Sequence, residues 1–101
     1  MTRTMEDIVR EQARLIVLKA LAEQVNETLN SDLMRAELAA AGINKPREWL
    51  HDQLQWLKAM EAVTLISFGT ILVATLTEKG AQHLRREISI EGIQRPSRPG
   101  G

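Results

Sequence analysis

The hydrophobic pattern of this chain changes its period at Ala62, and this change restricts the fold more than any other feature. Before that residue, apolar side chains recur mainly at helical spacing. After it come two runs rich in β-branched residues, 63–67 and 70–75, joined by Phe68 and Gly69. A two-residue link that contains glycine is typical of a tight hairpin. The pattern therefore predicts a helical domain that carries a small β-hairpin.

The first helix is predicted over residues 5–25. Thr4 is a suitable N-cap residue, and Asp7 stands three positions later, as in a capping box. The apolar face of this helix is wider than a single stripe, because Ile16 and Val17 extend it. Two interpretations are open: the helix is sunk in the core of its own domain, or a second subunit covers the surplus and forms a homodimer through helix 5–25.

Two further helices are predicted close together. A very short strand is expected within 26–30, followed by a helix over 32–41 that ends at Gly42, where glycine tolerates the left-handed conformation. The third helix, 46–60, begins at a proline, which is favoured at the first helical position because no N–H is needed there. Only about four residues separate the two helices, and such a pair matches the helix-turn-helix unit.

Thr77 is expected to cap a fourth helix over 78–87. The predicted fold is thus mainly α with a small β-hairpin. Its order of helix, short strand, helix, helix, two-stranded wing and helix is that of a winged helix-turn-helix domain. After residue 88 the sequence has no period and is rich in Pro and Gly, so we divide the chain into a domain, 1–88, and an extended or disordered C-terminal tail, 89–101. The alternative is a three-helix bundle with an incidental hairpin.

The composition argues against several classes of function. Lys and Arg together number 13, as do Asp and Glu, so the zero net charge gives no general attraction to nucleic acid. The absence of Cys removes disulfides and thiolate metal sites, and we expect neither a metal nor a cofactor. No apolar stretch suits a membrane span or a signal peptide, so the expected location is the cytoplasm. There is no glycine-rich phosphate loop and no nucleophile–base set, so we expect no enzyme.

The third predicted helix carries the candidate site, because a helical projection divides it into an apolar arc and a polar arc. The apolar arc holds both tryptophans and is expected to pack into the core, although Gln53 interrupts it. The polar arc contains a ridge whose residues recur at spacings of four, four and three, an arrangement that fits a DNA major groove. This ridge consists of Arg47, His51, Gln55 and Lys58.

Some neighbouring charges favour DNA binding by this ridge, and others oppose it. Arg35 in the second helix and Lys45 in the turn add positive charge, whereas Glu48 and Asp52 flank the ridge and repel phosphate. The wing has no Lys or Arg to offer to a minor groove. Both histidines are interpreted as ordinary surface residues. Two alternatives stay open: a solvated helix face, and a winged-helix module that binds another protein without contacting DNA.

Several segments resemble known families. Residues 76–80, LTEKG, resemble the junction after the wing in MarR-, PadR- and ArsR-type regulators. Over nearly its full length the chain resembles small ArsR-like proteins of Mu-like phages and prophages, at 14–23 (RLIVLKALAE), 56–57 (WL), 76–80 and 90–96 (IEGIQRP). The resemblance implies a winged-helix fold and binding of double-stranded DNA in a phage or prophage. It does not imply metal sensing, because the metal-sensing branch uses clusters of Cys and His.

Overall fold

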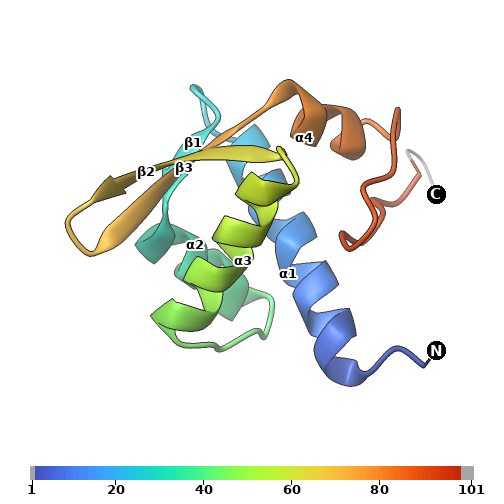
Figure 1. Ribbon diagram of the computed structural model, residues 1–101, viewed down its shortest axis with the longest axis horizontal. Helices are drawn as coiled ribbons and strands as arrows, with labels where there is room; N and C mark the ends of the chain where they lie inside the picture. Colours follow the sequence, from blue (N-terminus) through green and yellow to red (C-terminus); the bar gives the residue numbers. More distant parts are fainter. Residues whose placement is uncertain (1, 99–101) are drawn as a thin grey trace.

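The computed structural model describes residues 2–98, which form four helices and one three-stranded antiparallel sheet. The order of the elements is the predicted one. The β2–β3 hairpin projects from the helical body, and α4 lies at the other end of the molecule (Figure 1). The elements are α1 (Met5–Ala22), β1 (Thr28–Asn30), α2 (Ser31–Ala40), α3 (Arg47–Ala59), β2 (Val63–Phe68), β3 (Ile71–Leu76) and α4 (Glu78–Leu84).

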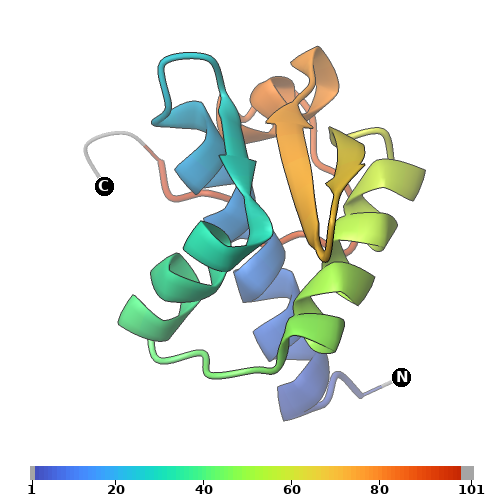
Figure 2. The ribbon, with the colours of Figure 1, turned by 90° about the vertical axis from the view of Figure 1, so that its left-hand side faces the viewer.

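The sheet has the strand order β1-β3-β2, so a strand from early in the chain completes the hairpin. β1 pairs only with residues 73–75 of β3, whereas β2 and β3 pair along their whole length, up to Phe68 and Ile71. The turn therefore consists of Gly69 and Thr70, one position later than predicted. Gly69 has a φ of 62°, as the favoured two-residue hairpin turns require. Figure 2 shows the sheet in front of α1, with α2 and α3 on either side.

α1 is covered mainly by its own domain. Its buried residues lie around much of its circumference, and the exposed large apolar side chains on it are Met5 and Ile8, near its start. Of the two interpretations of its wide apolar face, the structure favours burial in the chain's own core, and this removes the reason to place a dimer contact there. α1 also ends at Ala22, three residues earlier than predicted, and Val25 is fully exposed. The buried residues of α1 are Ala13, Leu15, Val17, Leu18, Ala20 and Leu21.

Side chains cap the helices at α1, α2 and α4. The predicted capping box at α1 is confirmed: Thr4 Oγ1 accepts from the Asp7 N–H, and the Thr4 N–H donates to the Asp7 carboxylate, both at 3.1 Å. These hydrogen bonds hold the pKa of the Asp7 carboxyl below its usual value. Thr77 caps α4 as predicted. α2 begins at Ser31, one residue early, because Asn30 caps it.

The turn between α2 and α3 has the predicted glycine geometry. Gly42 has a φ of 85°, and the Ile43 N–H donates to the Leu38 carbonyl at 2.8 Å, so the end of α2 is closed by backbone hydrogen bonds. Pro46 is the N-cap residue of α3 and not its first residue, so α3 covers 47–59 and not 46–60. In the described part of the chain, no side chain caps α3.

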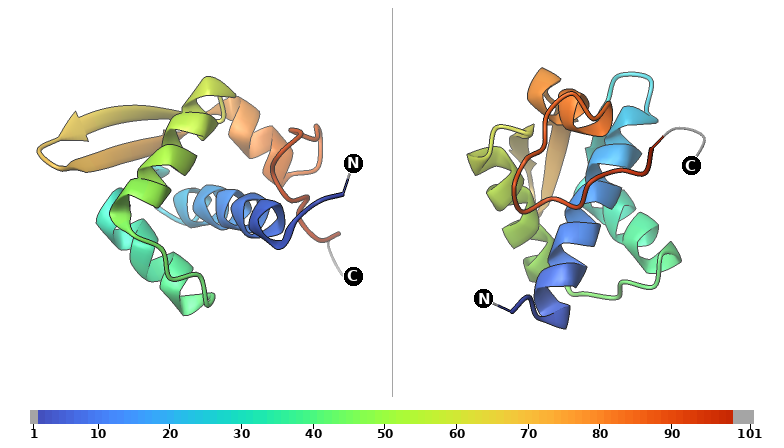
Figure 3. Two further views of the ribbon diagram at one scale, coloured as in Figure 1. Left: turned by 60° about the horizontal axis from the view of Figure 1, so that its bottom comes forward. Right: turned by 90° about the vertical axis from the view of Figure 1, so that its right-hand side faces the viewer.

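The described part of the C-terminal segment, 89–98, is irregular but packs on the helices. Ile90 and Ile93 are each only 4 % exposed and belong to the main core. The Gln94 N–H donates to the Glu11 carbonyl at 3.2 Å, so the segment crosses α1 (Figure 3, right). The boundary expected after residue 88 therefore does not separate this stretch from the domain, because its two isoleucines complete the core. α4 itself ends at Leu84, short of the predicted 87.

Candidate nucleic-acid interface

α3 is fixed in place by its apolar arc, as predicted. Leu50, Leu54 and Leu57 are fully buried. Gln53, which interrupts this arc in the sequence, is also buried and accepts a hydrogen bond from Arg14 Nε at 2.9 Å. The same guanidinium lies 3.8 Å from the ring centroid of Trp56, in a cation–π contact. The inner side of α3 is thus occupied by the chain's own core, and only its outer side is available to a ligand.

The predicted ridge on α3 is divided into two halves. Its first half lies against α2: Arg47 Nη2 is 3.7 Å from Asp32 Oδ1, and His51 Nε2 is 3.4 Å from Ser31 Oγ. Both side chains are only partly exposed. Arg47 Nε is buried and has no hydrogen-bond partner among residues 2–98. The side chains of these two residues are therefore held by contacts within the domain, and only part of each is accessible to a ligand.

The second half of the ridge faces solvent. Gln55 and Lys58 are exposed. The acidic residues Glu48 and Asp52 are exposed as well, so the outer strip of α3 begins with two carboxylates and ends with a cation. The structure thus keeps all four ridge residues on one helix but gives them different surroundings.

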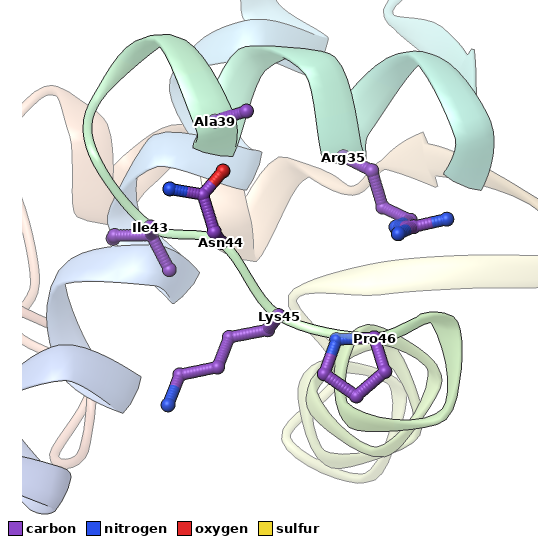
Figure 4. A pocket seen from close by; sticks show the side chains of 6 residues that line it. All are labelled: Arg35, Ala39, Ile43, Asn44, Lys45 and Pro46. Atoms are coloured by element: carbon purple, nitrogen blue, oxygen red, sulfur yellow. The ribbon is translucent and has the colours of Figure 1, made fainter.

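An open pocket beside the α2–α3 turn is lined by two of the predicted cations. It has a volume of about 330 Å³. Figure 4 shows Arg35 coming from α2 and Lys45 from the turn, with their charged ends pointing in different directions. Lys45 Nζ is also 5.6 Å from the ring centroid of Trp49. The lining residues are Arg35, Ala39, Ile43, Asn44, Lys45 and Pro46.

The chemistry of this pocket suits an anion. Arg and Lys side chains are the usual donors to phosphate oxygens. The pocket also includes Pro46, the N-cap residue of α3, whose side chain makes no capping hydrogen bond, and a helix N-terminus carries a partial positive charge. We name the group Arg35, Lys45 and Arg47 the basic turn.

A buried serine connects the hairpin to α2 and α3. Ser31 is 0 % exposed, and its Oγ accepts from the Leu72 N–H at 3.1 Å while it faces His51. Three elements, α2, α3 and β3, thus meet at one hydroxyl group. Sequence reasoning missed this role, because a serine at the start of a helix is ordinarily interpreted as a cap.

His83 is not the surface residue that the sequence suggested, since it is 0 % exposed. Its Nδ1 accepts from the Ile90 N–H at 3.0 Å, so Nε2 carries the hydrogen and donates to the Gln94 carbonyl, also at 3.0 Å. This histidine holds the C-terminal segment in place. Among residues 2–98, no group of three or more His, Asp or Glu side chains is arranged to bind a metal ion.

Comparison with known proteins relates this chain to a phage protein. It is 31 % identical over 90 residues to Uncharacterized protein gp26 of Escherichia phage Mu, and the match covers 89 % of this chain and 93 % of the phage protein. The chain therefore belongs to the family of phage Mu gp26. No protein-family model and no solved structure matches it. Within residues 2–98, no helix has the length and apolar character needed to cross a membrane.

Proposed function

We propose that this phage protein is a winged-helix DNA-binding protein, a transcription regulator or accessory factor that reads the major groove with α3. Three features support the winged-helix assignment: the tight α2–α3 pair, the hairpin that follows it, and the completion of the sheet by β1. In helix-turn-helix proteins the second helix of the pair enters the major groove. The resemblance to ArsR-like phage proteins points to the same function.

The observation that carries the proposal is the basic turn. Its three cations lie around the start of α3. Contacts to phosphate fix the register of a recognition helix on the duplex. A phosphate in the pocket beside Arg35 and Lys45 would hold the start of α3 against the DNA backbone.

Base contacts would then come from the exposed half of the ridge. Gln55 has the donor and acceptor pair that recognises adenine, and Lys58 can donate to guanine or to a phosphate. Glu48 and Asp52 can accept a hydrogen bond from cytosine, but they repel the phosphates of the DNA backbone. We therefore expect weak binding to arbitrary DNA and a preference that depends on sequence.

The test is fluorescence anisotropy with labelled double-stranded DNA, using phage fragments and a random duplex, at low and moderate salt. Wild-type binding should weaken as salt rises, because cations released from DNA contribute to binding. Arg35→Ala/Lys45→Ala should bind about tenfold or more weakly and lower the salt slope by about two, one per lost phosphate contact.

The matched control is Lys19→Ala, which removes an exposed cation from α1 and should bind like the wild type. Absence of wild-type binding at low salt, with the protein folded, would overturn the proposal.

A second candidate is a winged-helix module that binds another protein. The specific observation in its favour is the pair of exposed carboxylates, Glu48 and Asp52, on the outer strip of α3 of a chain with zero net charge. Partner binding that survives high salt, together with an absence of DNA binding, would favour this function over the first.

A further inference from the structure

The hydroxyl group of Ser31 has a defined hydrogen-bond direction. Ser31 is 0 % exposed, and its Oγ contacts two groups among residues 2–98: the Leu72 N–H at 3.1 Å and His51 Nε2 at 3.4 Å. A backbone N–H can only donate, so Oγ is the acceptor in the first contact. The single hydrogen of the hydroxyl group is then left for His51, because a buried donor without a partner is costly.

This direction decides which nitrogen of His51 carries the hydrogen. In a neutral imidazole ring, the nitrogen that accepts a hydrogen bond is bare, and the hydrogen lies on the other nitrogen. Nε2 of His51 accepts from the Ser31 hydroxyl group, so Nδ1 carries the hydrogen. His83 has the opposite arrangement, because its Nδ1 accepts from the Ile90 N–H and its Nε2 donates to the Gln94 carbonyl.

The Nδ1–H group of His51 is available to a ligand. Among residues 2–98, the ring atom of His51 that is hydrogen-bonded is Nε2, and the one buried side-chain nitrogen or oxygen without a partner is Arg47 Nε. Nδ1 of the partly exposed His51 is therefore neither paired within this part of the chain nor buried. Because Nδ1 is bonded directly to Cγ, it stays close to the surface of α3.

We propose that Ser31 fixes His51 in the Nδ1–H tautomer, and that His51 thereby donates a hydrogen bond to an acceptor on a base edge in the major groove. This inference rests on the DNA-binding function proposed above. The acceptors in that groove are N7 and O6 of guanine, N7 of adenine and O4 of thymine, and guanine, which offers two acceptors and no donor, fits best. The amino group of cytosine is itself a donor and does not fit. A base edge suits Nδ1 better than a phosphate, because this atom lies close to the helix and the phosphates lie at the rims of the groove.

The tautomer can be measured without DNA. Long-range proton–nitrogen NMR spectra at about pH 8, where histidine side chains are ordinarily neutral, distinguish a ring nitrogen that carries a hydrogen from a bare one. The chain has two histidines, and the spectra should place the hydrogen of His51 on Nδ1 and that of His83 on Nε2. Ser31→Ala should change the His51 signals toward a mixture of both tautomers and leave those of His83 unchanged. An Nε2–H tautomer at His51, or His51 signals that Ser31→Ala does not alter, would overturn the proposal whether or not DNA binds.

The contact itself is tested by DNA binding of two variants with side chains of nearly the same shape. The amide of His51→Asn places a donor near the position of Nδ1, whereas His51→Leu offers no donor. Anisotropy titrations with the preferred phage fragment should find His51→Asn within about threefold of the wild type. His51→Leu should bind about tenfold more weakly, as the loss of one hydrogen bond predicts. The salt slope should be unchanged in both variants, because a neutral imidazole releases no cations from DNA.

The outcomes separate this contact from the proposed function. Equal affinities of the two variants, or an equal loss on the random duplex, would overturn the base contact, because contacts to phosphate do not depend on sequence. A lower salt slope in both variants would show that His51 acts as a cation at a phosphate and would also overturn it. If the wild type binds no DNA although His51 has the Nδ1–H tautomer, the DNA-binding function fails and the contact fails with it. The reversed tautomer in a protein that binds DNA would overturn this proposal alone.

Discussion

At the scale of single residues, His83 shows how a buried polar side chain joins two segments. It accepts from one backbone group of the C-terminal segment and donates to another. We expect His83→Ala to lower the free energy of unfolding by about 2–4 kcal/mol, since it leaves the Ile90 N–H unsatisfied and opens a cavity. Urea denaturation measures this change. His51→Ala, at a partly exposed position, should lower the free energy of unfolding by less than about 1 kcal/mol. Equal losses in the two variants would contradict the role of His83 in joining the two segments.

Gly80 allows α4 to pack closely against the backbone at Ala62, and helix propensity alone does not indicate this role. An added Cβ would lie 2.4 Å from the Ala62 carbonyl oxygen and 2.7 Å from Leu76 Cδ1. Alanine normally stabilises a helix by about 1 kcal/mol relative to glycine, but here we expect Gly80→Ala to lower the melting temperature, because backbone must move.

Gly42→Ala is the comparison for Gly80→Ala. Apart from its chain neighbours, no residue in the range 2–98 has an atom within 4 Å of a Cβ added at position 42, although the φ there is 85°. The loss there should be about 1–2 kcal/mol, from left-handed strain alone. A rise in melting temperature for Gly80→Ala would show that the close approach at this glycine is not tight.

At the scale of elements, the C-terminal segment contributes to the core as a helix would. Ile93→Ala should reduce the free energy of unfolding by about 2–5 kcal/mol, as large-to-small changes in cores do. Ile88→Ala, at a position that is 37 % exposed, should cost clearly less. Thermal or urea unfolding compares the two variants, and similar losses would mean that the segment is not packed as described.

The link between α2, α3 and the hairpin can be tested at Ser31. Ser31→Ala leaves the Leu72 N–H without its partner, and we expect a loss of about 1–3 kcal/mol. NMR shifts should appear at both Leu72 and His51. Ser67→Ala, at an exposed position of β2, should leave stability and both signals nearly unchanged. Shifts confined to α2 would contradict the three-element contact.

The order and type of the elements could be predicted from the sequence because the signals are local. Helical spacing, the capping residues and the glycine of the hairpin each act over a few residues. The ends were less predictable: α1 and α4 stop early, and α2 begins one residue early because Asn30 caps it. The packing of 89–98 depends on contacts such as that of Arg14 Nη1 with the Gly92 carbonyl at 2.8 Å, across 78 residues, for which no local pattern exists.

At the scale of the whole molecule, the candidate site was only partly accessible to sequence reasoning. Periodicity placed Arg47, His51, Gln55 and Lys58 on the polar arc of one helix. It did not show that α2 holds the first two, because Asp32 and Ser31 reach them only through the fold. The same holds for the pocket that groups Arg35 with Lys45.

We expect DNA to bind at the basic turn and the outer strip of α3. An NMR titration of the labelled protein with a short double-stranded DNA at low salt tests it most directly. The largest shifts should fall at Arg35, Lys45, Arg47, Gln55 and Lys58. A several-fold excess of DNA that moved no signal, or shifts that gathered in α4 and residues 85–98, would contradict DNA binding at this surface.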